Sequence, residues 1–156
     1  FGVRFFVTTH SISSECTERL FMKSAAMNQW LQTLSGAIGQ RLEMNDEGLL
    51  ALELQSGLVC TIEVDATAEV VSFHSDLMSF DPEQASDLNE YAMEKNVYNL
   101  GSYGLTLGID NTRGFLVAST SVPESLLTEE SFLILFERFV SAVEENHRDF
   151  QRFSAG

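Results

Sequence analysis

Two stretches of alternating residues separated by a glycine turn constrain the fold of this chain most strongly. Leucines alternate with other residues over 50–54, and a second apolar alternation runs over 58–65. Gln55-Ser56-Gly57 lies between them and suits a tight turn. Because strand side chains point alternately to opposite faces, each stretch predicts a strand with one buried face. The short turn makes the two strands antiparallel neighbours, so we expect an antiparallel sheet.

Further strands are predicted on both sides of this hairpin. Residues 41–44 have the pattern of a short strand, and residues 69–74 that of a strand after a bend. Residues 103–110 and 115–122 form a second hairpin through Asn111-Thr112-Arg113-Gly114.

Three segments with helical periodicity accompany the strands. Residues 27–39 place their apolar side chains on one face. Asp81-Pro82-Glu83-Gln84 combines a cap, a proline for the first helical position and a glutamine that reaches back, so a helix over 81–96 is predicted. Thr128 caps a last helix with a long phenylalanine-rich face. The order indicates the α+β class, with the sheet covered by helices on one side.

The charge excludes two classes of partner. Nine Lys and Arg residues stand against 23 Asp and Glu residues in 156 positions, giving a net charge of −14. Nucleic acid and anionic membranes repel such a surface. Strong acidity suits a basic or unstable protein partner, although solubility alone explains it equally well.

The charge is not evenly distributed. Residues 1–26 hold three basic and two acidic residues, whereas the remaining 130 hold six basic and 21 acidic residues. We therefore expect a boundary near Met27, with 1–26 as an N-terminal extension (vector sequence, a fused peptide or upstream sequence) and 27–156 as the domain.

The Cys, His, Asp and Glu residues of the sequence show no spacing that is typical of a catalytic or metal site. Cys16 and Cys60 belong to no metal-binding pair, and the pattern predicts that Cys60 is buried and reduced, as in the cytosol. The three histidines lack metal-ligand spacing, and His147 is expected to pack within the domain. Paired carboxylates such as Glu63 and Asp65 are predicted to face solvent. Catalysis by two carboxylates needs surroundings that give them different pKa values, and solvent does not supply that difference. We predict no catalytic residue, metal site or cofactor.

Several short motifs in order resemble the class I type III secretion chaperones, the Tir-chaperone or CesT-like family. The resemblance covers residues 27–153. It includes the opening Asn28-Gln29-Trp30-Leu31-Gln32-Thr33-Leu34, the strand Cys60-Thr61-Ile62-Glu63-Val64-Asp65 and the segment Tyr103-Gly104-Leu105-Thr106-Leu107-Gly108-Ile109-Asp110. Small size and low pI agree with the family.

This resemblance implies a homodimer with an α-β-β-β-α-β-β-α protomer and no enzymatic activity. It implies a bacterial cytoplasmic chaperone, associated with virulence, that binds the N-terminal region of one secreted effector. The chaperone keeps that region partly unfolded and delivers it to the secretion apparatus, whose ATPase is a candidate partner. Two rivals remain: an adaptor or regulator of the same fold that binds another cytosolic protein, and a small enzyme with a carboxylate site.

Two sets of site residues follow. A binder of unfolded protein needs a sheet edge and shallow apolar patches. We predict a hydrophobic effector-binding patch, although its members suit the protomer core equally well: Trp30, Leu31, Leu34, Leu50 and Leu52. The apolar stripe of the 81–96 helix is thin, which together with the family resemblance predicts a dimer interface there, formed by Leu88, Tyr91, Met93 and Val97.

Overall fold

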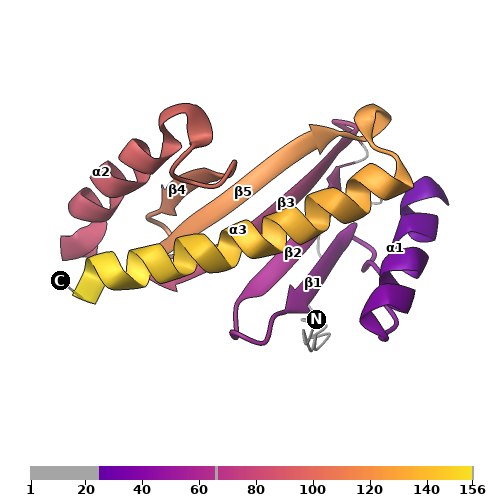
Figure 1. Cartoon of the computed structure of the whole chain (residues 1–156), viewed down its shortest axis with the longest axis horizontal. Helices are drawn as coiled ribbons and strands as arrows, with labels where there is room; N and C mark the ends of the chain where they lie inside the picture. Colours follow the sequence, from indigo (N-terminus) through magenta and orange to yellow (C-terminus); the bar gives the residue numbers. More distant parts are fainter. Residues whose placement is uncertain (1–24, 66, 156) are drawn as a thin grey trace. The chain divides into compact units, whose positions relative to one another are not determined.

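The computed structural model describes residues 25–65 and 67–155, with the elements ordered as Figure 1 shows. The helices are α1 (Ala25–Ile38), α2 (Ala85–Asn96) and α3 (Glu129–Ala155), and the strands are β1 (Leu49–Glu53), β2 (Val59–Asp65), β3 (Val70–Ser79), β4 (Thr106–Asp110) and β5 (Phe115–Pro123). Single-turn 3-10 helices are Pro82–Gln84, Val97–Asn99 and Glu124–Leu126. The strands form one sheet in the order β1-β2-β3-β5-β4. The predicted α+β class and α-β-β-β-α-β-β-α order are thus confirmed.

The predicted N-terminal extension lies outside the described residues except at its end. Helix α1 begins at Ala25, two residues before the predicted boundary at Met27.

Three predicted strands differ from the structure. The strand predicted over 69–74 is longer, because β3 extends to Ser79. Residues 41–44 are not a strand, although Leu42 and Met44 alternate and are buried. The backbone N–H of Leu42 donates to the Ser35 hydroxyl at 2.9 Å, which is a side-chain acceptor and not a strand partner. Strand β4 begins at Thr106 instead of Tyr103, because Tyr103 lies in a turn with a φ of 56°.

The described chain forms two compact units, and residues 25–72 and 121–133 make the first unit. Strands β1 and β2 pair antiparallel in it, with Leu50 opposite Ile62. The turn before β1 requires glycine at position 48, whose φ is 78°, because a Cβ there would lie 2.9 Å from the Val64 carbonyl oxygen. The rings of Trp30 and Phe132 lie 5.5 Å apart between centroids, so α1 packs on the start of α3.

The second unit comprises residues 73–120 and 134–155. Phe73 on β3 packs against Phe136 and Phe139 on α3, with centroids 6.5 and 5.6 Å apart. The ring Nδ1 of His147 lies 2.6 Å from the Leu77 carbonyl oxygen, which confirms its predicted packing role. Asp81 and Gln84 form the predicted capping box ahead of α2. Within the described residues, no helix is long and apolar enough to cross a membrane.

Candidate protein-interaction surfaces

The predicted effector-binding residues all lie in the core of the first unit. Leu52 is 0% exposed and Trp30, the most exposed of the set, is 8% exposed; the others are Leu31, Leu34 and Leu50. These side chains are therefore not a surface patch in this structure. Helical and strand periodicity identifies residues that share a face, and it does not tell whether the chain itself or a partner covers that face.

The backbone of β1 offers a different kind of surface. The N–H of Leu54 donates to the Leu58 carbonyl at 2.7 Å, and the N–H of Val64 donates to the Gly48 carbonyl at 3.0 Å. In an antiparallel pair the bonded positions alternate with positions whose N–H and C=O point the other way. Together with the register of β1 and β2, this directs the backbone groups of Leu49, Ala51 and Glu53 away from β2.

These outward groups lie on an edge strand, since β1 is the first strand of the sheet. Asn45 already binds Leu49, accepting its N–H on Oδ1 at 2.8 Å and donating its own N–H to the Leu49 carbonyl at 2.9 Å. Among the described residues, Ala51 and Glu53 therefore present the edge of β1 that remains for a further strand. A row of this kind is a template for an added strand.

Helix α1 of the same unit carries no charged residue over Ala25–Ile38, in a chain with a net charge of −14. Two of its exposed polar side chains bind the first turn of α3, because Thr33 Oγ1 and Gln29 Nε2 both donate to the Glu129 carboxylate. The first unit thus combines an open strand edge with an uncharged helix.

The predicted dimer-interface residues include both buried and exposed side chains. Leu88 is 2% exposed and packs inside the second unit. Tyr91 is partly buried and stacks on Phe153 with centroids 4.3 Å apart. Met93 and Val97 are 62% and 56% exposed and are accessible to a partner.

More apolar side chains are exposed on the loop after α2, which sequence reasoning placed in a strand or left unassigned. Tyr98, Leu100 and Tyr103 are 88%, 80% and 50% exposed. With Met93 and Val97 they supply five of the nine large apolar side chains that are exposed within the described residues. We call these five residues the loop surface.

The backbone of this loop is strained. Tyr98, Asn99 and Tyr103 have φ values of 54°, 55° and 56°. Such a conformation costs a residue other than glycine on the order of 1–3 kcal/mol and persists only where the surroundings impose it. The loop must therefore be held by other contacts.

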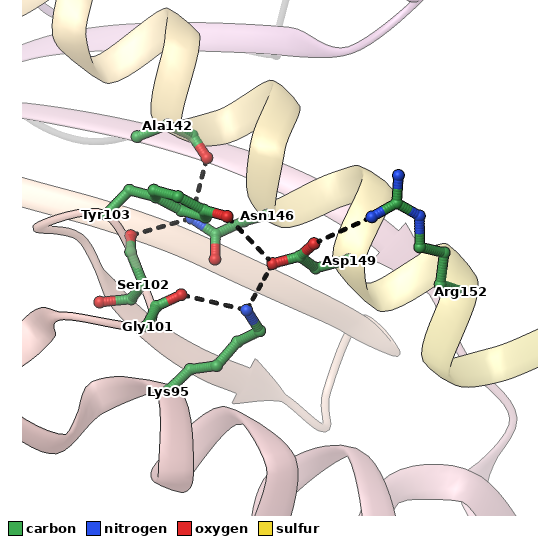
Figure 2. Close-up of polar contacts among 8 residues, drawn as sticks. All are labelled: Lys95, Gly101, Ser102, Tyr103, Ala142, Asn146, Asp149 and Arg152. Carbon is green, nitrogen blue, oxygen red and sulfur yellow. Dashed lines mark hydrogen bonds and ion pairs between the residues drawn. The ribbon is translucent and has the colours of Figure 1, made fainter.

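Lys95 at the end of α2 supplies the principal contact, as Figure 2 shows. It is 9% exposed, and its Nζ donates to the Asp149 carboxylate on α3 at 2.6 Å and to the Gly101 carbonyl at 3.0 Å. The Tyr103 hydroxyl lies 3.4 Å from the same carboxylate oxygen. Arg152 Nη1 lies 3.7 Å from the other oxygen, so Asp149 is paired on both sides.

Two asparagines fix the rest of the loop. Asn146, 0% exposed, donates from Nδ2 to the Ser102 carbonyl at 2.9 Å, as Figure 2 shows. The side chain of Asn96 pairs with the backbone of Leu107, donating to its carbonyl at 2.8 Å and accepting its N–H at 2.9 Å.

Sequence reasoning missed Lys95 and Asp149, because 54 residues separate them and no local pattern links them. The one available signal was that Lys95 is the sole basic residue of α2.

The remaining chemistry is sparse. Cys60 is 0% exposed, as predicted. Within residues 25–65 and 67–155, no group of three or more His, Cys, Asp or Glu side chains is placed to hold a metal ion. The first unit thus offers the backbone edge of β1, and the second unit offers the loop surface.

A known protein family matches most of this chain. The model of the Tir chaperone protein (CesT) family matches residues 29–146. No curated protein matches the chain.

Solved structures share the fold at low sequence identity. The HopA1-SchA chaperone-effector complex contains a chain with a TM-score of 0.65 and 18% identity, covering 86% of this chain and 99% of that one. The ExsC-ExsE complex gives a TM-score of 0.61 at 19% identity, covering 81% and 94%. The ExoT-SpcS complex from Pseudomonas aeruginosa gives 0.56 at 19% identity, covering 78% and 97%. At these identities the likeness concerns the fold.

Proposed function

Because the chain belongs to the Tir chaperone protein (CesT) family, we propose that it is a bacterial cytosolic chaperone for a type III secreted effector. It binds the N-terminal region of the effector, keeps that region partly unfolded and delivers it to the secretion apparatus. The secretion ATPase is the partner proposed for delivery. The similar chain in a chaperone-effector complex supports this proposal.

The structural observation that carries the proposal is the edge of β1. An unfolded segment has backbone donors and acceptors that need partners, and the outward groups of Ala51 and Glu53 provide them. The buried side chains of Leu50 and Leu52 hold β1 in place. Trp30, Leu31 and Leu34 hold α1 in the same unit, so the five predicted residues act by supporting the binding surface.

The proposed assembly is a homodimer formed through α2 and the loop surface. Met93 and Val97 contact the partner directly, whereas Leu88 and Tyr91 support the helix from inside. The exposed apolar side chains favour this arrangement, because burying them in a partner removes apolar area from water.

The test is affinity purification from the native bacterium with Ala51→Pro as the decisive variant. Proline removes the outward N–H of Ala51 and leaves the bonded pairs between β1 and β2 in place. Ala51→Val, which keeps the N–H, is the matched control. We expect the wild type and Ala51→Val to retain a secreted effector through its N-terminal region, and Ala51→Pro to lose it while folding normally.

Two results would contradict the proposal. Retention of a cytosolic protein that is not secreted would identify an adaptor or regulator of the same fold. Equal retention by Ala51→Pro and Ala51→Val would place effector binding away from the edge of β1.

A further inference from the structure

Stability alone is a weak explanation for the buried ion pair of Lys95 and Asp149. Removing two charges from water costs free energy that their attraction offsets only with good geometry, and apolar side chains of similar size often serve stability as well. Lys95 is nonetheless 9% exposed and bound to Asp149 at 2.6 Å. The best-attested use of such a pair is the selection of one conformation over others.

The conformation selected here is that of the loop 97–104. Gly101 lies against Lys95 so closely that a Cβ there would come within 3.0 Å of the Lys95 Cα. The rings of Tyr91 and Tyr103 lie 5.3 and 5.7 Å from the Lys95 Nζ, within cation–π distance. With the Gly101 carbonyl and Asp149, the lysine therefore joins α2, the loop and α3 at one point (Figure 2).

This anchoring orients the apolar side chains of the loop. Ser102 is 0% exposed and held by Asn146, whereas Tyr98 and Leu100 are 88% and 80% exposed. The positive φ values of Tyr98 and Tyr103 need such support, since a loop without its anchor relaxes to more favourable backbone conformations.

We propose that the Lys95–Asp149 pair holds loop 97–104 as a preformed docking element for a second copy of this chain. The inference rests on the homodimer of the proposed function. Two copies that each carry −14 repel one another except across uncharged surface, and residues 96–109 contain no charged side chain. A preformed loop also avoids the cost of ordering its side chains on binding.

The exposed area is adequate for such a contact. A stable interface buries roughly 800 Å² on each partner, and a tyrosine contributes on the order of 150–250 Å² when buried. Tyr98 and Tyr103, with Met93, Val97 and Leu100, supply a large share of that area from one short segment.

The test compares Lys95→Met with Arg148→Met in the full chain. Each variant removes one cation and one ion pair, but Arg148 pairs with Glu145 on the exposed side of α3. We expect Lys95→Met to raise the dimer dissociation constant by about tenfold or more, together with a lower Tm because Asp149 loses its buried partner. Amide exchange of residues 97–104, measured where both proteins are monomeric, should become about tenfold faster. Arg148→Met should change neither quantity.

The outcomes separate this inference from the proposed function. A wild type that is monomeric at all concentrations overturns the homodimer and with it the partner named here. A dimeric wild type with an unchanged Lys95→Met dissociation constant overturns the role of the ion pair alone. If Lys95→Met does not fold, Tyr98→Ser with Leu100→Ser tests the loop surface, because both side chains are exposed. An unchanged dimer in that variant also overturns the inference.

Discussion

Two hydrogen bonds join the guanidinium of Arg113 to the carboxylate of Asp76, with Nη1 to Oδ2 at 2.8 Å and Nη2 to Oδ1 at 3.0 Å. The Nε of the same arginine donates to Asp110 Oδ2 at 2.6 Å. One side chain in the turn between β4 and β5 thus joins β3 to the end of β4.

Acid should weaken this connection. The side-chain hydrogen bond from Arg113, and then its backbone N–H, lower the pKa of Asp110 below its ordinary value of 3.8. A carboxylate with a lowered folded-state pKa stabilises the fold above its unfolded pKa, and that contribution is lost as the pH falls through the folded value. We expect the Tm difference between the wild type and Arg113→Gln to be positive at pH 7 and to shrink below about pH 4.

Arg41→Gln is the control for that measurement, because Arg41 pairs with Glu43 in an exposed position where such pairs contribute little. Its Tm should follow the wild type at every pH. A difference for Arg113→Gln that is constant with pH would show that the carboxylate of Asp110 is not involved.

A charge in the core of the first unit should unfold it. Leu31 is 2% exposed, so Leu31→Glu buries a carboxylate without a partner and should lower the free energy of unfolding by about 3–5 kcal/mol. Gln32→Glu adds the same charge at the exposed neighbouring position and should change it by less than about 0.5 kcal/mol. Chemical denaturation measures both. If Leu31→Glu keeps its stability and loses effector binding, Leu31 contacts the effector directly.

The proposed homodimer makes a prediction about mass. Light scattering at micromolar concentration should give twice the 17.4 kDa of one chain. Met93→Asp should shift the protein towards the monomer without a lower stability, because Met93 is 62% exposed. Leu126→Asp makes an equivalent change at a side chain that is 71% exposed in the first unit, and should leave the dimer intact. A wild-type mass near 17 kDa would contradict the dimer.

The predicted boundary near Met27 makes a prediction about truncation. A chain that begins at Met27 loses two residues of α1, of which Ala26 is exposed. We expect it to dimerise and to melt within a few degrees of the full chain, as calorimetry and light scattering will show. Aggregation or a much lower Tm would make residues 1–26 part of the folded domain.

The sequence predicted the elements well where side-chain pattern determines them. The alternation of Leu50 and Leu52 and the capping box at Asp81 led to the correct strand and helix. The recognised family was also correct, since the matched residues 29–146 fall within the predicted range.

The sequence predicted the interaction surfaces less well, for two physical reasons. A buried face of the protein and a face that a partner covers have the same apolar pattern, so Trp30 and Leu34 were placed in a surface patch. The loop 97–104 is set by the pairing of Lys95 with Asp149 and by positive φ values at tyrosines, neither of which local propensity encodes. The backbone edge of β1 depends on which residues hydrogen bond to β2, and that register requires the structure.

The bonds between Asn96 and Leu107 occupy one backbone position at an edge of the sheet. Strand β4 ends the sheet opposite to β1, and the side chain of Asn96 occupies both backbone groups of Leu107. A strand that adds at this position must first displace Asn96, just as a strand that adds at Leu49 on β1 must displace Asn45. A sheet that is open at both ends can propagate from molecule to molecule into a fibre. An asparagine at one position of each edge leaves fewer backbone groups through which such a series can extend.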